Sequence, residues 1–471
     1  MTGRRSHLAG AVLGALAGTL AGAIAPAVTA AHQLRERYAS PLPLAAYVLG
    51  AAVAVALSFA FVVLRSAPLV VRSAGGDPRS ITVPRAVRVG LRGLGLLGWL
   101  WVVVQGMVAG SGDSADAPSL ILWVYGWVGL SLVSALVGPA WRWIDPFSSI
   151  FDLLAAIARR LGLRGPAALP YPAVLRSWPA VGGYVAFVWF ELVIQGTRAG
   201  HLLAAILVLY TLWTLAMMAQ YGREPWQAGG ETFSVWFATL GRLAPLALDA
   251  QTGADDGRLI VRRFGTGLIG RAWTSDIVVL VAIATGAILY DGLSQTTPFF
   301  DVFGAPGVIA ATALLGGWLI LVSVLALIVG RVVGLQALGA GLLPISVGYL
   351  IAHYLTYLLF DGQRIVALVN DPLNRGASFL GIDEFQPNQA WLPAAVAWAI
   401  QLGAVVGGHV IGAWAGHRAA VEAATGEAAM VSDAGSTARG IRLRQVPLAA
   451  LMVGLTSLTL WSLGQVIVQH A

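Results

Sequence analysis

The side chains best placed to do chemistry are three carboxylates and one histidine within, or at the ends of, long apolar runs. Glu191 lies in Phe-Val-Trp-Phe-Glu-Leu-Val, with no other charged residue within four positions. Asp291 and Asp361 each end an apolar run and precede a glycine, and His353 lies in Ala-His-Tyr, eight residues before Asp361. An ionisable group at membrane depth must be paired or hydrated to offset its desolvation. These four residues are therefore the candidate functional groups.

Carboxylates and an imidazole at one end of a helix bundle predict either a divalent-metal site or a general base. Asp291 and Asp361 are both expected at the outer mouth, with His353 one to two helical turns below them and Glu191 behind. Aspartate at a helix C-terminus opposes the helix dipole, which favours a functional reason for it. The alternative is structural, because the glycine after each aspartate is an ordinary helix cap and buried polar groups commonly hydrogen-bond neighbouring helices.

A second buried histidine, His409, is not expected to share a metal with His353. The two enter the membrane from opposite sides, so at 1.5 Å per residue they differ in depth by more than about 10 Å. The chain has no cysteine, which excludes disulfides and thiolate ligands. It also lacks a nucleophile elbow, a phosphate-binding loop and a zincin motif.

Apolar runs of about twenty residues must position these groups, since that length spans a bilayer as a helix. We predict an all-α, multi-pass bundle of ten transmembrane helices plus an N-terminal segment. The ten predicted spans are 44–64, 90–110, 119–139, 180–197, 201–221, 274–292, 307–330, 339–360, 392–416 and 446–468.

Basic residues orient this bundle. All 29 are arginines, and with the spans above they fall on one side of the membrane except for Arg35, Arg37, Arg198, Arg364 and Arg375. Basic loops mark the cytoplasmic side, which predicts a cell-membrane protein with its C-terminus outside. The net charge of +7 is thus a topology signal, and the expected partner is the lipid bilayer, not nucleic acid.

Composition leaves no room for a separate soluble domain, because 58% of the 471 residues are hydrophobic and only 11% are charged. Residues 1–31 resemble a secretory signal or a retained first span, and 32–471 form one membrane-embedded helical domain. We predict interfacial helices near 146–164 and 231–248, where apolar residues recur at helical spacing. The segment 423–440, rich in Ala, Gly, Ser and Thr, predicts a flexible cytoplasmic linker.

Several motifs, in order along most of the chain, resemble the multi-pass actinobacterial-type membrane proteins labelled fenitrothion hydrolase. They include Val-Gly-Pro-Ala-Trp-Arg-Trp-Ile-Asp-Pro-Phe at 137–147, the Glu191 motif, Tyr-Asp-Gly-Leu-Ser-Gln at 290–295, the His353 to Gln363 stretch and Gly408-His409. The resemblance implies hydrolysis of an aromatic thiophosphate triester, and it supplies no catalytic residues.

Two classes of function remain open from the sequence. The first is a membrane-bound phosphotriesterase-like hydrolase, in which a divalent metal held by Asp291, Asp361 and His353 activates water against an apolar or aromatic ester. The second is a transporter for a small molecule, in which Glu191, His353 and His409 form a stepwise polar path that titrates during turnover. A scaffold that docks through its arginine-rich loops is the third alternative.

Overall fold

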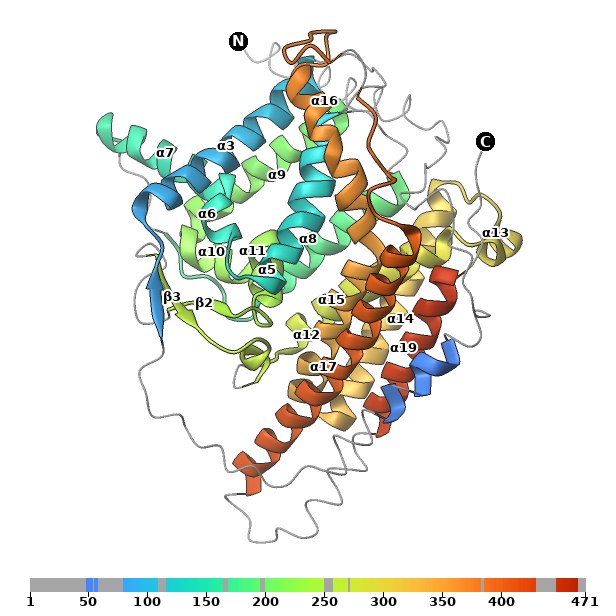
Figure 1. The fold of residues 1–471 in the computed structure, drawn as a ribbon. Coiled ribbons are helices and arrows are strands. Elements are labelled where there is room, and N and C mark those ends of the chain that lie inside the picture. The colour runs from blue at the N-terminus through green and yellow to red at the C-terminus, as the bar shows by residue number, and fades with distance from the viewer. Residues whose placement is uncertain are drawn as a thin grey trace, which may run out of the picture.

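The computed structural model describes residues 48–53, 55–57, 79–108, 116–163, 168–194, 200–249, 257–269, 272–382, 385–428 and 446–464. These residues form a helical protein with one small sheet (Figure 1). The helices are α3 (Arg85–Val108), α4 (Ala117–Ser119), α5 (Leu130–Leu136), α6 (Trp141–Ile144), α7 (Pro146–Arg160), α8 (Trp178–Trp189), α9 (Gly200–Tyr221), α10 (Arg223–Gly229), α11 (Thr232–Leu240), α12 (Ser275–Ser294), α13 (Thr297–Phe303), α14 (Val308–Val333), α15 (Leu335–Phe360), α16 (Ile365–Asn370), α17 (Ala394–Ala428) and α19 (Val446–Gly464).

Two helical segments have π geometry, η1 (Leu120–Gly129) and η2 (Phe190–Ile194), and two short segments, η4 (Thr266–Leu268) and η5 (Asp361–Arg364), are 3-10 helices. The all-α prediction omitted a three-stranded antiparallel sheet in the order β1 (Ser80–Thr82), β3 (Arg258–Val261), β2 (Leu246–Leu248). Ser80 pairs with Ile260, and Leu246 pairs with Val261. The sheet lies at the edge of the helical body and contributes little to its core.

Seven helices of the described residues are long and apolar enough to cross a membrane, as expected for an all-α membrane protein. They are Arg85–Val108, Ala117–Leu136, Gly200–Tyr221, Ser275–Ser294, Val308–Val333, Leu335–Asn370 and Ala394–Ala423. The three other predicted spans coincide with shorter apolar helices at Val48–Leu57, Trp178–Ile194 and Pro447–Ser462. The number of ten spans therefore stays a prediction.

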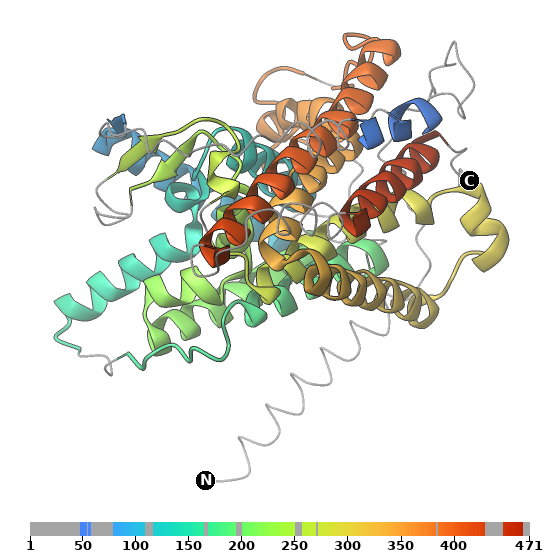
Figure 2. The same ribbon diagram turned by 90° about the horizontal axis from the view of Figure 1, so that it is seen from below.

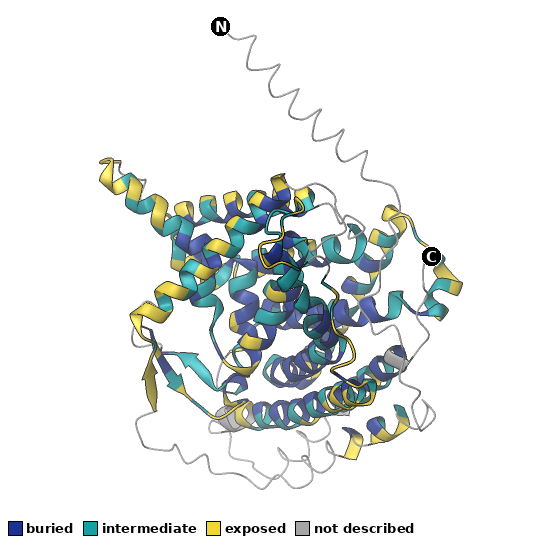
Figure 3. Cartoon of the chain, turned by 45° about the horizontal axis from the view of Figure 1, so that its top comes forward, coloured by how far each residue is buried: buried dark blue, intermediate teal, exposed yellow. Residues whose placement is uncertain are grey.

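The spans α12 and α15 form the centre of the protein. In their most apolar windows 89% and 83% of the residues are buried by the rest of the chain, far more than in any other span. Figure 3 shows both helices as mostly buried, whereas α3 and α7 carry many exposed residues. A helix that is apolar on all sides is typical of such a central position. Polar groups on α12 and α15 are consequently enclosed by protein.

Glycines allow α15 and α17 to pack with their backbones in contact (Figures 1 and 2). A Cβ at Gly408 would lie 2.7 Å from the carbonyl oxygen of Pro344, and one at Gly412 would lie 2.4 Å from that of Gly341. Neither position has room for a side chain. The small residues therefore set the distance between these two helices.

The first predicted interfacial helix exists as α7. Asp145 caps it by accepting hydrogen bonds from the backbone of Phe147 at 2.8 Å and of Ser148 at 3.3 Å, and Pro146 opens the first turn. The later apolar residues of α7, such as Leu153 and Ile157, are exposed. An exposed apolar face suits a position against the membrane surface, which remains a prediction.

The second predicted interfacial helix, 231–248, requires correction. The helix α11 ends at Leu240, the chain turns, and residues 246–248 form β2. Trp236 and Phe237 are 1% and 3% exposed, so this apolar face packs inside the protein and does not face lipid. The guanidinium of Arg242 lies over the ring of Trp273, 4.2 Å from its centroid.

Three predictions fall wholly or partly outside the described residues. They are the signal-like segment 1–31, the C-terminal side of the membrane, and the linker 423–440 beyond its first residues. Helix α17 continues to Ala428, into the segment predicted as linker.

Candidate functional site

Asp291 and His353 meet inside the bundle. The carboxylate Oδ2 of Asp291 lies 2.7 Å from Nε2 of His353 and accepts a hydrogen bond from the Tyr354 hydroxyl at 2.9 Å. Its Oδ1 accepts a hydrogen bond from Gln295 Nε2 at 2.7 Å. The side chains of Asp291 and His353 are each only 9% exposed. One carboxylate thus has an imidazole, a phenol and an amide as partners, as expected for a buried polar group.

Local helix geometry brings these groups together. Asp291 and Gln295 are four residues apart at the end of α12, and so lie on one face of the helix. His353 and Tyr354 are neighbours on α15, and their rings lie 4.5 Å apart at 86°, edge to face. Because α12 packs against α15, the two pairs meet across the helix interface. The site therefore depends on the packing of the two most buried spans.

The other side of the His353 ring borders a narrow pocket between α12, α15 and α19. Its lining includes Gly292, Tyr349, His353, Thr459 and Ser462. A Cβ at Gly292 would lie 3.3 Å from Ser462 Oγ and 3.9 Å from His353 Nδ1, so the glycine keeps this space open. The free space is about enough for one water molecule. With Nε2 directed at Asp291, the Nδ1 side of the ring lies toward Gly292 and the pocket.

Glu191 lies on the π-helical turn η2, directly after α8. Single π-helical turns within helices are rare and occur frequently at functional sites. The side chain is half-buried, and its carboxylate is near enough to Asp291 and Tyr354 to interact with both electrostatically. The prediction that Glu191 takes part in the site behind Asp291 and His353 stays a prediction.

Aromatic side chains of η1, α8 and η2 pack together near Glu191 along the chain. Trp123 of η1 lies 5.0 Å from Phe187 and 6.3 Å from Phe190, measured between ring centroids. Trp127 lies 4.8 Å from Phe187. Of these rings, those of Trp123, Phe187 and Phe190 are half-buried. They offer an apolar, aromatic surface beside a carboxyl group.

Asp361 does not join Asp291. It lies on η5, past the end of α15, and pairs with Arg364 at 3.4 Å, with side chains 35% and 43% exposed respectively. His353 is eight residues earlier on α15, which is about 12 Å along a helix. Of the three residues predicted to form one site, Asp291 and His353 thus lie together, whereas Asp361 lies apart from them. The sequence predicted that both aspartates lie at helix ends, but it did not show that the side chain of Asp291 is buried against α15.

Within the part of the chain that the structure describes, no group of three or more His, Asp or Glu side chains is arranged to hold a metal ion. The predicted divalent-metal site at Asp291, Asp361 and His353 therefore has two ligands together and the third elsewhere. Protein sites for divalent metals usually supply at least three ligands. Asp291 and His353 are instead bound to each other.

Sequence reasoning missed Tyr354, Thr459 and Ser462. Gln295 had a signal, because a glutamine four residues after an aspartate at a helix end can reach it. Tyr354 had only its position beside His353. No sequence signal identified the hydroxyls of Thr459 and Ser462 on α19. Serine and threonine are common in apolar spans, and the helix face that they occupy depends on packing.

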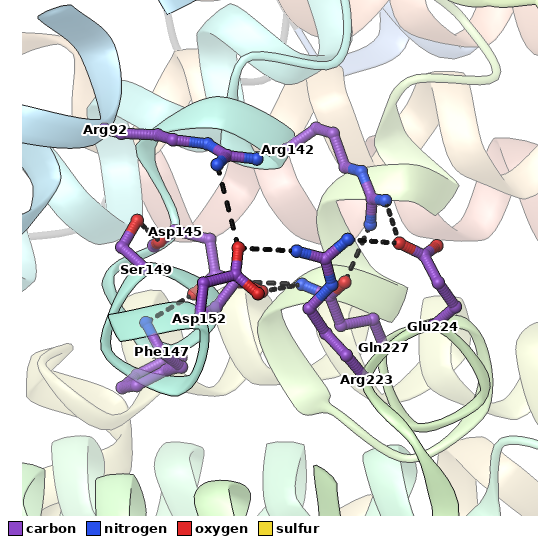
Figure 4. A network of polar contacts seen from close by, with 10 residues as sticks. Arg92, Arg142, Asp145, Phe147, Ser149, Asp152, Arg223, Glu224 and Gln227 are labelled. Carbon is purple, nitrogen blue, oxygen red and sulfur yellow. Dashed lines mark hydrogen bonds and ion pairs between the residues drawn. The ribbon is translucent and has the colours of Figure 1, made fainter. Parts of the chain in front are cut away.

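A second polar cluster lies near the C-terminal end of α9, between α7 and α10 (Figure 4). Arg142 donates to Gln227 Oε1 at 2.7 Å and binds Glu224, while Arg223 binds Asp152 at 2.7 Å. Gln227 in turn donates to Oδ2 of the buried Asp145 at 2.7 Å.

This cluster has one unusual carboxyl group. Burial and the nearby charge of Glu231 raise the pKa of Asp145 to about 6. Asp145 caps α7 and Glu231 caps α11, so two helix starts depend on neighbouring buried carboxyl groups. Apart from the pair of Arg223 and Glu224 within α10, the ion pairs of this cluster join different helices, which indicates a structural role for the cluster.

No protein-family model, curated protein or solved structure matches the chain. The resemblance to the proteins labelled fenitrothion hydrolase thus stays an expectation from the motifs.

Proposed function

We propose that this membrane protein is a proton-coupled transporter of a small apolar or aromatic molecule, with Asp291, His353 and Glu191 carrying the coupling proton. The observation that carries the proposal is the buried pair of Asp291 and His353, held by Tyr354 and Gln295. Ionisable groups enclosed among membrane spans are costly, and they commonly mark proton relays in transporters.

The pair has the parts that a reversible proton site needs. With Nε2 held by Asp291, a proton arriving from the pocket binds Nδ1 of His353 and gives an imidazolium beside a carboxylate. Loss of that proton returns the neutral ring. Glu191 is a second carboxyl group that responds electrostatically to the charge on Asp291. Protonation at one site therefore alters the other.

The aromatic cluster beside Glu191 supports an apolar or aromatic solute. Trp123, Phe187 and Phe190 leave part of their surface uncovered, and a solute arriving from the lipid phase would gain contact area there. Protonation of Glu191 would remove a charge from this surface. Solute binding and proton binding would thereby be linked.

The test uses purified protein in liposomes that contain a pH-sensitive dye. Uptake of a panel of labelled aromatic solutes, together with proton influx, would be measured with and without an imposed pH gradient. We expect one or more solutes to drive proton movement, and expect Asp291→Asn to abolish it. Asp361→Asn is the matched control, because Asp361 lies outside the pair, and it should retain the wild-type rate. Transport would be refuted if every solute entered at the rate measured for protein-free liposomes, both with and without the pH gradient.

Hydrolysis is the second candidate, and one observation favours it. Ser462 borders the same pocket as His353, and the other nitrogen of His353 contacts Asp291, so a serine and a histidine with an aspartate partner are near one another. The present pocket is far smaller than an aromatic triester, which needs several hundred Å³. Hydrolysis would therefore require α19 to move away from α12 and α15.

Membranes containing the protein would be assayed for nitrophenol release from an aromatic thiophosphate triester, with and without a chelator. Release that is lost in Ser462→Ala and insensitive to the chelator would favour a serine hydrolase. Release that the chelator abolishes would favour the metal-dependent reaction. Activity no higher than in control membranes would remove this candidate.

A further inference from the structure

A line of buried polar groups continues from His353 along α15 toward the middle of the bundle. Ser346, Tyr349 and His353 are three and four residues apart and so lie on one face of α15. His409 of α17 approaches that face, with its ring centroid 5.7 Å from that of Tyr349. Thr459 of α19 lines the pocket beside His353, together with Tyr349. We call Ser346, Tyr349, His409 and Thr459 the inner polar seam.

Three atoms of the inner polar seam lack a hydrogen-bond partner among the described protein groups. They are Ser346 Oγ, the Tyr349 hydroxyl and Nε2 of His409, whose residues are 1%, 1% and 0% exposed. A buried polar atom that is left without a partner destabilises the folded state. Three of them on facing sides of one interface indicate a site for a small polar ligand.

The protein groups nearest to Tyr349 and His409 make their hydrogen bonds within α19. The Thr459 hydroxyl lies beside Tyr349 but donates to the carbonyl of Leu455 at 2.8 Å. The Met452 carbonyl lies beside His409 but accepts from Thr456 at 2.8 Å. Neither makes a hydrogen bond of normal geometry to the seam atom next to it.

We propose that the inner polar seam binds a short chain of water molecules that carries protons between His353 and His409. From His353 to Ser346 the chain covers seven residues of helix, or about 10 Å. Three or four water molecules about 2.8 Å apart bridge that distance. The pocket beside His353, large enough for about one water molecule, is the outer end of the chain.

Proton transfer along this chain needs no other reactant. A proton leaving Nδ1 of His353 passes to water, each water passes one on, and Nε2 of His409 accepts the last, because its Nδ1 already contacts the carbonyl of Val405 at 2.8 Å. The close glycine packing of α17 on α15 brings His409 within reach. This proton path rests on the proposed transport function, whereas the presence of bound water does not.

Bound water is tested by hydroxyl-radical footprinting of the intact protein in lipid nanodiscs. Radicals made by X-ray pulses modify buried side chains only where water is adjacent, and mass spectrometry locates them. We expect Tyr349 to be modified although it is 1% exposed. Met218, 0% exposed among apolar residues and intrinsically more reactive, should stay unmodified. Equal protection of both residues would show a dry seam and overturn the inference.

The proton path is tested in the liposome assay with Tyr349→Phe and His409→Leu. Both should slow proton influx at least tenfold without a change in solute affinity, and folding is checked by size-exclusion chromatography and thermal melting. Wild-type influx in both variants, with the loss in Asp291→Asn retained, would overturn the path and leave the proposed transport intact. No solute-driven influx in the wild type would refute transport, and the footprint alone would then decide whether the seam binds water.

Discussion

The contact between Asp291 and His353 predicts a large energetic coupling. We would replace Asp291 by alanine and His353 by leucine, singly and together, and measure the free energy of unfolding of all four proteins. Neither replacement can form a new hydrogen bond, so the double-mutant cycle isolates the interaction of the two side chains. The cycle cancels the cost of leaving Tyr354 and Gln295 without their acceptor, because that cost occurs in both variants that lack Asp291.

The magnitude follows from burial and geometry. The two side chains are 9% exposed and 2.7 Å apart, and a hydrogen bond to a charged group of this kind contributes about 1.5–3 kcal/mol. We expect a coupling free energy of about 2 kcal/mol. Asp361 and Arg364 are the matched control: they are 3.4 Å apart, but 35% and 43% exposed, so their coupling should stay below about 0.5 kcal/mol.

The assay is reversible unfolding in mixed micelles by increasing amounts of a denaturing detergent, followed by tryptophan fluorescence and circular dichroism. A coupling for Asp291 and His353 no larger than that of the control pair would refute the reasoning. It would mean that the Asp291 carboxylate and the His353 ring are not held together by a strong hydrogen bond in the folded protein. The proposed proton site would then lose its main support.

Three further predictions concern pH, packing and metal. Because the pKa of Asp145 is raised from 3.8 to about 6, the folded protein retains a proton that the unfolded chain has released. Stability should therefore fall by about 3 kcal/mol in total as pH rises from about 3 to about 7, and this loss should be absent in Asp145→Asn when unfolding is measured across that range. Gly408→Ala should destabilise the protein by about 1–3 kcal/mol, since its Cβ would lie 2.7 Å from the carbonyl oxygen of Pro344. The control Gly407→Ala should be neutral or stabilising, because a Cβ there has no other atom within 4 Å. Equal melting temperatures of the two variants would contradict this prediction. Treatment with a chelator should leave solute-driven proton influx unchanged, and a loss that added divalent metal restores would point back to a metal site.

Much of the fold could be predicted from the sequence, because apolar length alone identifies membrane-crossing helices. The seven long apolar helices and the start of α7 at Pro146 agree with the expectations. The small sheet and the short α11 did not follow from periodicity. A run such as Phe233 to Leu243 has the same helical spacing whether it faces lipid or protein, and only its neighbours decide which.

The candidate site could be predicted only in part. Glu191, Asp291 and His353 stood out because a charge within an apolar run is costly wherever the helix packs. Asp361 shared the same local motif as Asp291, yet one side chain is buried and the other pairs with Arg364 near the surface. The same Asp-Gly pair after an apolar run is therefore found in two different environments.

The sequence by itself determined the class of the protein and the residues under electrostatic constraint, since hydrophobicity and charge are properties of each residue. Tertiary structure decided which of those residues meet. It joined Asp291 to His353 and Tyr354, separated Asp361, and placed Tyr349, His409 and Thr459 on facing sides of one interface. Contacts of this kind depend on the rotation and depth of each helix against its neighbours. These are fixed by close packing of residues far apart in the chain, such as Gly408 on Pro344, which no local pattern reveals.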